Sequence, residues 1–76
     1  MAALRRILVV DDSPTIRRVV SQVLRQAGYD VATADDADAG IQEARAVKPD
    51  LILLDFVMPG MNGYQFVKRL DAEDVS

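Results

Sequence analysis

Fully apolar runs of four residues occur twice in the chain, and each run ends at an acidic residue. Ile7–Val10 precedes Asp11, and Leu51–Leu54 precedes Asp55. A run that is apolar at every position lacks the alternation of a half-buried strand, so it predicts a strand covered on both faces of a parallel sheet. We expect these two runs to be central strands. Residues 30–34 predict one more strand, the second in chain order, with weaker alternation.

Helical periodicity separates the predicted strands. Ser13-Pro14 is a favourable helix start, and Gly28 is a favourable left-handed stop. A second helix is expected to begin at Asp35 or Asp36 and to end before Pro49. The predicted inner faces are Ile16, Val19, Val20, Val23, Leu24 and Ala27 in the first helix, and Ala37, Ile41, Ala44 and Val47 in the second.

The segment after Asp55 has a different character. Residues 56–63 are predicted to form a loop because they contain proline and glycine. Asn62 is expected to cap a third helix, with Gln65 completing a capping-box pattern. The resulting alternation of strands and helices predicts an α/β fold with a parallel sheet and right-handed crossovers. A flavodoxin-like strand order, 2-1-3, makes the first and third strands neighbours.

Composition narrows the classes of protein that fit. The chain has 76 residues, so one small domain is expected. A formal net charge of −3 disfavours a nucleic-acid groove or an anionic membrane surface as the main partner. Cysteine and histidine are absent, which removes disulfides, thiol chemistry and the commonest transition-metal ligand. With no long apolar segment, we expect a soluble cytoplasmic protein without a secretory signal.

Asp11, Asp12 and Asp55 are the candidate chemical groups. They meet at one end of the sheet if the first and third strands are adjacent. Their mutual repulsion is relieved by protonation or by a cation, and an all-oxygen site with room for water suits Mg²⁺, with Mn²⁺ as a substitute. A carboxylate whose charge is offset in this way can act as a nucleophile toward phosphorus. The alternative is that Asp11 and Asp12 only cap a helix and form a turn on a solvated rim.

Three segments together resemble the receiver domain of two-component response regulators, the CheY-like family. They are Val9-Val10-Asp11-Asp12-Ser13, Leu53-Leu54-Asp55 and Met58-Pro59-Gly60-Met61-Asn62-Gly63. The spacing between the acidic pair and Asp55 also fits the family, and the resemblance covers essentially the whole chain. It implies the flavodoxin-like fold predicted above.

The resemblance also implies residue roles. Asp55 matches the phosphoacceptor, which takes a phosphoryl group from a histidine kinase or a histidine phosphotransfer protein. Asp12 and Asp55 match direct Mg²⁺ ligands, Asp11 matches a ligand that acts mainly through water, and the backbone carbonyl of Val57 matches a further ligand. Such a domain is a signalling phosphoacceptor rather than an enzyme. Pro14, Thr15 and Arg18 match the region where the family docks its kinase. The alternative interpretation, that they only form a solvated helix face, fits equally well.

The family has five βα units, and residues 1–76 correspond to the N-terminal portion of a single receiver domain. The family's fourth-strand Ser/Thr and fifth-strand Lys have no counterpart in this sequence, so we expect impaired phosphotransfer. The Leu51–Leu54 strand is expected to have one edge without a partner from its own chain. Because a flat apolar edge attracts another strand, we expect self-association, as an edge-paired or intertwined oligomer.

Other classes of protein remain to be weighed. A non-catalytic assembly module built on the receiver half-fold is the main alternative, and a weak response to Mg²⁺ would favour it. A phosphatase of the haloacid-dehalogenase type needs Asp-x-Asp after the first strand, whereas Asp11 and Asp12 are adjacent. A dinucleotide site needs a glycine-rich turn after the first strand, and Asp11-Asp12-Ser13 at this position excludes it. The acids of residues 35–40 are out of register for a calcium loop.

Overall fold

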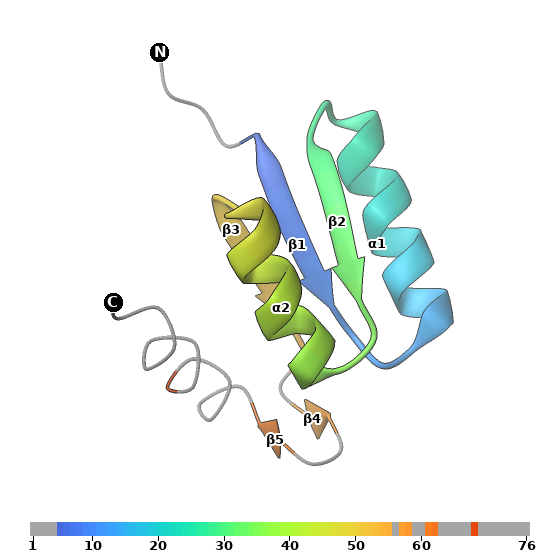
Figure 1. The fold of residues 1–76 in the computed structure, drawn as a ribbon. Coiled ribbons are helices and arrows are strands. Elements are labelled where there is room, and N and C mark those ends of the chain that lie inside the picture. Colours follow the sequence, from blue (N-terminus) through green and yellow to red (C-terminus); the bar gives the residue numbers. More distant parts are fainter. Residues whose placement is uncertain (1–4, 56, 59–60, 63–67, 69–76) are drawn as a thin grey trace.

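The computed structural model describes residues 5–55, 57–58, 61–62 and 68. Three parallel strands form a sheet in the order β2-β1-β3, and a separate two-stranded antiparallel pair follows (Figure 1). The parallel order confirms the predicted flavodoxin-like arrangement. The elements are β1 (Arg6–Val10), α1 (Pro14–Gln26), β2 (Asp30–Ala34), α2 (Ala37–Val47), β3 (Leu51–Leu54), β4 (Val57–Met58) and β5 (Met61–Asn62).

Strand register brings the carboxyl ends of the three main strands level with one another. Val10, the last residue of β1, pairs with Ala34 on one side and with Leu54 on the other. Asp11 and Asp55 therefore leave neighbouring strands at the same height. The adjacency of β1 and β3, which the chemical argument requires, is confirmed.

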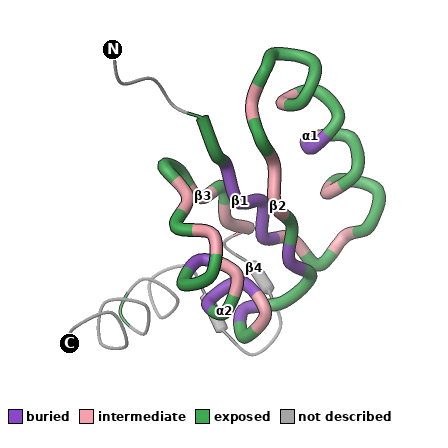
Figure 2. The backbone as a smooth tube through the Cα atoms, turned by 45° about the horizontal axis from the view of Figure 1, so that its top comes forward, coloured by how far each residue is buried: buried purple, intermediate pink, exposed green. Residues whose placement is uncertain are grey.

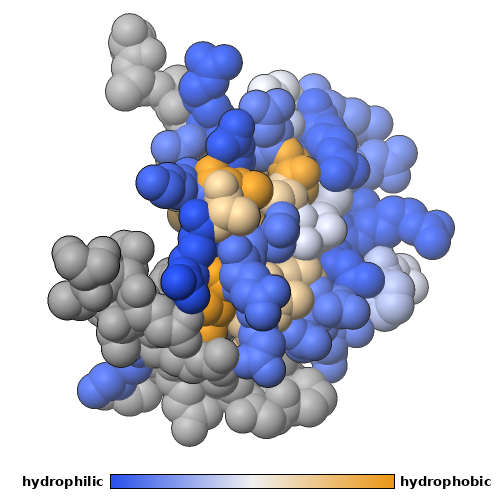
Figure 3. Space-filling view, viewed as in Figure 1, coloured by the Kyte–Doolittle hydropathy of each residue, from blue (hydrophilic) through white to orange (hydrophobic). Residues whose placement is uncertain are grey.

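The sheet face covered by α2 holds the main core. Leu8 and Val10 are fully buried there, and Ile41 on α2 is 1% exposed. The tube in Figure 2 shows this burial along β1 and the inner side of α2. Seen from the same side as in Figure 1, hydrophilic residues frame a central strip of hydrophobic ones (Figure 3). The cluster comprises Leu8, Val10, Ala34, Ala37, Ile41 and Ala44, which confirms the predicted inner face of α2 except at half-buried Val47.

The opposite sheet face is covered by α1 only in part. Side chains alternate along a strand, so Ile7 and Val9 point away from α2, and both are buried. On α1, however, Ile16, Val19 and Val23 are 50–58% exposed. The prediction that these three residues belong to an inner face is therefore wrong. Helical periodicity identifies an apolar stripe, but α1 lies over β1 and β2 and leaves much of that stripe without a covering element among the described residues.

Strand β3 is an edge of the sheet and is paired only with β1 among the described residues. Its even-numbered residues are half-buried toward the α2 core, whereas Leu51 and Leu53 are 40% and 37% exposed. The prediction of a central strand covered on both faces is thus wrong here. The expectation of an unpaired edge with one uncovered face is confirmed for the part of the chain that the structure describes.

The helix boundaries follow the predicted signals. Ser13 and Asp36 cap α1 and α2, each side chain accepting a hydrogen bond from the backbone N–H three residues on. After α1, Gly28 adopts a φ of +101°, a left-handed conformation that favours glycine. At the other end of the sheet, Asp50 Oδ2 accepts hydrogen bonds from the backbone N–H groups of Arg5 and Arg6, both at 3.0 Å.

The predicted loop after Asp55 contains strand pairing. Val57 pairs with Asn62 and Met58 with Met61, so the loop prediction is wrong at these four positions. The predicted third helix follows Asn62 and precedes the polar tail of residues 71–76, so it lies outside the described residues except for Lys68, which is helical. Within the described part, no helix is long and apolar enough to span a bilayer.

Candidate functional site

The acidic residues at the carboxyl edge of the sheet are held by backbone hydrogen bonds. Asp11 N–H donates to the Ala34 carbonyl at 3.1 Å, and Asp55 N–H donates to the Val10 carbonyl at 3.0 Å. These bonds extend the sheet pairing one residue beyond β1 and β3. Both acidic side chains are therefore placed by the rigid sheet rather than by a free loop.

Asp11, Asp12 and Asp55 form a compact cluster. One carboxylate oxygen from each lies within 4.8 Å of the others; Asp11 and Asp55 are half-buried, and Asp12 is exposed. The cluster opens onto a cavity of about 300 Å³ between α1 and β3, whose lining includes Ile16 and Leu53. The three carboxylates singled out in the sequence are thus brought together.

The turn between β1 and α1 orients Asp11. Its Oδ1 accepts a hydrogen bond from Ser13 N–H at 2.8 Å, while Ser13 in turn caps α1. The helix N-terminus beside the cluster contributes partial positive charge, which favours anionic groups there. Asp11 therefore serves the fold as a turn residue and also contributes a carboxylate oxygen to the cluster.

Arg17 is a residue near this site that the sequence reasoning did not find. Its Nη1 donates to the backbone carbonyl of Asp11 at 2.7 Å, so a guanidinium group braces the turn that carries the acids. No local sequence motif predicts this contact, because it depends on how α1 packs against the end of β1. Arg17 does not neutralise the carboxylates through an ion pair with Asp11 or Asp12 in the structure.

The donor set fits a hard divalent cation. Oxygen ligands of Mg²⁺ lie about 2.1 Å from the ion, so two opposite ligands are about 4.2 Å apart. The present spacing of up to 4.8 Å needs only a small side-chain adjustment to reach this value. Three carboxylates and no soft ligand among the clustered residues favour Mg²⁺ or Mn²⁺ over thiophilic metals. Val57, the fourth residue implied by the resemblance, lies in β4, and its carbonyl remains a predicted ligand.

Known proteins share this sequence pattern. PhoB of Escherichia coli, a phosphate regulon transcriptional regulatory protein, is 44% identical over 95% of this chain, which spans 31% of PhoB. Protein PilH of Pseudomonas aeruginosa is 46% identical over 90% of the chain, which spans 58% of PilH. The chain thus covers between about a third and three fifths of the length of these curated relatives.

Solved structures share the fold. The response regulator protein TrrA of Thermotoga maritima, solved in complex with Mg²⁺-BeF, superposes with a TM-score of 0.83 at 32% identity. That match covers 93% of this chain and 62% of the TrrA chain. The parallel β2-β1-β3 sheet, with acidic residues at its carboxyl edge, thus defines a receiver-type α/β domain. Residues 7–76 match the family model of the response regulator receiver domain, and the chain belongs to that family.

Proposed function

We propose that this chain accepts a phosphoryl group on Asp55 from a histidine kinase or a histidine phosphotransfer protein. The observation that carries the proposal is the convergence of Asp11, Asp12 and Asp55 within 4.8 Å at the ends of adjacent strands. Membership of the receiver family supports the same role. Asp55 is chosen as the acceptor because it matches the phosphoacceptor position of the receiver family and is half-buried beside the cavity. Asp12 is exposed, and Asp11 Oδ1 already accepts a hydrogen bond from Ser13 N–H.

In the proposed reaction, a carboxylate oxygen of Asp55 attacks phosphorus in line with the departing group. The new O–P bond forms as the N–P bond of the donor phosphohistidine breaks, and the released imidazole takes up a proton. Asp11, Asp12, Asp55 and the Val57 carbonyl would hold Mg²⁺, which supplies charge compensation for the incoming phosphoryl oxygens. The Mg²⁺-BeF complex of TrrA supports this ligand chemistry for a similar fold.

The part of the reaction that this sequence does not supply is anion stabilisation by the family's later Ser/Thr and Lys. Within the described residues, the donors beside the cluster are backbone N–H groups at the start of α1 and the Arg17 guanidinium, whose Nη1 already donates to the Asp11 carbonyl. A helix N-terminus alone binds an anion less strongly than a helix N-terminus and a lysine ammonium together. We therefore propose that phosphorylation of these 76 residues is slow and short-lived compared with that of longer relatives.

Acetyl phosphate provides a direct test without a cognate kinase. The chain is incubated with acetyl phosphate and Mg²⁺, and its intact mass is recorded beside Asp55→Asn and Asp30→Asn variants. Asp30 is a matched control because it begins β2, at the opposite end of the sheet. A phosphoryl adduct that requires Mg²⁺ and Asp55 but not Asp30 is expected. Absence of the adduct in a chain that circular dichroism shows to be folded would refute the proposal.

A second candidate, self-association as an assembly module, is favoured by one specific feature. We define the α1–β3 surface as the exposed apolar residues on α1 and β3: Ile16, Val19, Val23, Leu51 and Leu53. This surface adjoins a strand edge with no partner among the described residues. A second copy of this chain is the proposed occupant, because a two-fold contact would set apolar side chains against apolar ones and pair two equivalent open edges.

Sedimentation equilibrium of the chain and a Leu53→Lys variant tests self-association. A lysine at the edge introduces a charge that must be desolvated on pairing, so the variant is expected to shift toward monomer. Ala46→Lys is the matched control, since Ala46 is exposed on α2 and away from the surface. A parent chain that remains monomeric at all concentrations would exclude this role.

A further inference from the structure

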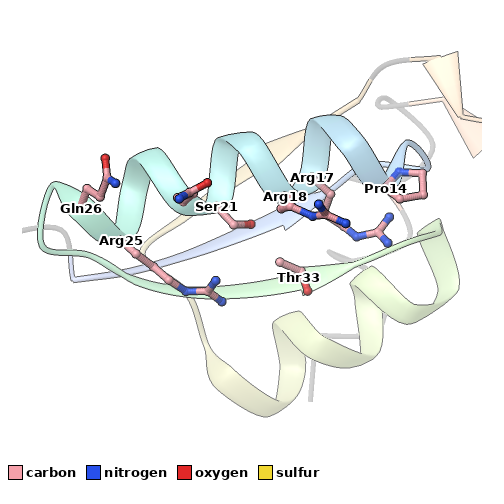
Figure 4. Close-up of a pocket in the computed structure, with 8 residues that line it drawn as sticks. Pro14, Arg17, Arg18, Ser21, Arg25, Gln26 and Thr33 are labelled. Atoms are coloured by element: carbon pink, nitrogen blue, oxygen red, sulfur yellow. The ribbon is translucent and has the colours of Figure 1, made fainter.

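A basic groove lies between α1 and β2, on the side of α1 away from β3. It has a volume of about 750 Å³ and is lined by Arg17, Arg18, Arg25, Ser21 and Thr33, together with Pro14, Gln22 and Gln26. Figure 4 shows Arg17 and Arg18 near one end of the groove and Arg25 near the other, with Ser21 between them. None of the described residues that line the groove is acidic, although the chain as a whole carries a net charge of −3.

Ser21 is an anomaly in this groove. It is the only polar residue buried in the described part of the chain, at 3% exposure, and its Oγ has no hydrogen-bond partner there. Buried polar atoms in folded proteins are almost always paired, because desolvation without a partner is costly. Figure 4 shows that the Ser21 hydroxyl faces the groove rather than the solvent side of α1. An unmet donor and acceptor thus stands beside the arginines.

Two of the arginines are held in place and keep spare donors. Arg17 Nη1 donates to the Asp11 carbonyl, and Arg25 Nη2 donates to the Val31 carbonyl at 3.3 Å. Each guanidinium carries five N–H donors, so most of them stay available for another acceptor. Arg18 is exposed, and no described carboxylate forms an ion pair with it. Two guanidinium groups of the groove are therefore held in place by the fold, and the positive charge of Arg18 is not balanced by a described carboxylate.

We propose that this groove binds an extended acidic peptide segment of a partner protein. Arg18 and Arg25 are seven residues apart on α1, which separates them by about 10 Å along the helix axis. Donors spread over that length do not converge on a single phosphate. An extended peptide in the polyproline II conformation has three residues per turn and rises about 3.1 Å per residue, so acidic side chains three positions apart lie on one face and span about the same distance.

The groups between the arginines suit a peptide backbone. The hydroxyl of Thr33 and the amide of Gln22, both exposed, can each donate and accept, as peptide N–H and C=O groups require. The covered Ser21 hydroxyl can do the same once a ligand displaces the side chains over it. The lining residues that the structure describes include no aromatic side chain on which a nucleobase could stack, and this disfavours single-stranded nucleic acid as the occupant. The groove is separate from the acidic cluster, which opens between α1 and β3.

Fluorescence anisotropy with a labelled eight-residue peptide tests the proposal on the intact chain. The probe carries glutamates three positions apart, and a glutamine version of the same peptide is the control ligand. We expect the acidic probe to bind, to weaken with added salt, and to lose about tenfold in affinity for Arg18→Gln and for Arg25→Gln. Arg45→Gln is the control variant because Arg45 is exposed on α2. It is expected to bind like the parent.

A Ser21→Ala variant tests whether the Ser21 hydroxyl contributes to peptide binding or has no role in it. Because the hydroxyl lacks a partner in the fold, its removal is expected to leave the urea midpoint unchanged or raised, while peptide affinity falls. Equal binding of the glutamine peptide, or unchanged affinity in all three groove variants, would overturn the proposal. Binding of tripolyphosphate without binding of the acidic peptide would overturn it in favour of a phosphate ligand.

Chemical-shift mapping of the unsubstituted chain gives a readout that does not depend on variant folding. Titration with the acidic peptide is expected to shift the backbone amides of Ser21, Gln22 and Thr33 most strongly. Shifts concentrated instead at Asp12 and Asp55, or on the α1–β3 surface, would place the peptide elsewhere and contradict the assignment.

Discussion

The two faces of the sheet both carry apolar side chains, but the covering helix buries them to different degrees. We call the well-covered α2 face the closed face and the partly covered α1 face the open face. On the α2 face, Leu8, Val10 and Ile41 are at most 1% exposed. On the α1 face, Ile7 and Val9 are buried, yet the apolar stripe of α1 remains half-exposed and a serine is the buried residue of that helix. Both helices show apolar residues at helical spacing. The contrast teaches that an amphipathic helix specifies a face to be buried but not the element that buries it.

The groove and the α1–β3 surface follow from this difference. Since α1 rests toward β2, it leaves arginines and Ser21 over one edge strand and valines beside the other. Among the described residues, a cavity of about 320 Å³ lies between α2 and β2, but both proposed interaction sites are on the α1 face. Stability should therefore depend mainly on the α2 face and interactions mainly on the α1 face.

Truncation of the closed core is expected to have the largest effect on folding. Ile41→Ala removes a side chain that is 1% exposed, and its loss should lower the free energy of unfolding by about 3–4 kcal/mol. Val23→Ala on the open face should change it by less than about 0.5 kcal/mol, because Val23 is 58% exposed and alanine is a better helix former. Urea unfolding followed by circular dichroism measures both values.

Comparable losses in the two variants would contradict the comparison between faces. They would mean that Val23 is covered in solution. Repeating the Val23→Ala measurement at two chain concentrations then identifies the cover. A loss that grows with concentration belongs to a second copy of the chain, as proposed for the α1–β3 surface, since oligomer stability follows mass action.

Removal of a helix cap is expected to have an intermediate effect. Ser13→Ala and Asp36→Ala each delete a side chain that accepts a backbone N–H, from Ile16 at 3.3 Å and from Ala39 at 2.7 Å. Each change should cost about 1 kcal/mol. Hydrogen exchange should reveal more opening in the first turn of α1 than of α2, because α1 has less buried apolar surface to hold it. Equal exchange in the two helices would argue that α1 is as firmly packed as α2.

The smallest effect is expected at Asp50, which ties the amino ends of β1 and β3 and belongs to neither face. Hydrogen bonds from the backbone N–H groups of Arg6 and Arg5 lower the pKa of Asp50 below its ordinary value of 3.8. A lowered carboxyl pKa stabilises the fold above pH 4 and loses that contribution as the pH falls through the folded-state value. Asp50→Asn should therefore reduce the urea midpoint slightly at pH 7.

A pH series completes this test. The difference between the parent chain and Asp50→Asn should shrink as both are titrated from pH 5 toward pH 2. Asp35→Asn is a suitable control, since Asp35 is exposed just after β2, at the other end of the sheet. A difference that stays constant over this range would show that the charge of Asp50 plays no part.

Much of the fold could be predicted from local sequence signals. The bounds of β2 and β3, the Ser13 cap, and the choice of Asp35 or Asp36 as the second cap rest on interactions within a few residues. The convergence of Asp11, Asp12 and Asp55 also could be predicted, because parallel neighbours must end at the same edge. The short β4–β5 pair was missed, since two residues per strand are too few to show a period.

The sequence alone determined the kind of elements, their order, the family, and the acids that end β1 and β3. Those properties arise from backbone preferences, side-chain periodicity and a distinctive set of motifs. Tertiary structure alone decided that Leu51, Leu53 and Val23 stay exposed, that Arg17 braces the Asp11 turn, and that Ser21 is buried without a partner. The physical reason is that burial depends on which distant element covers a residue, and no local pattern carries that information.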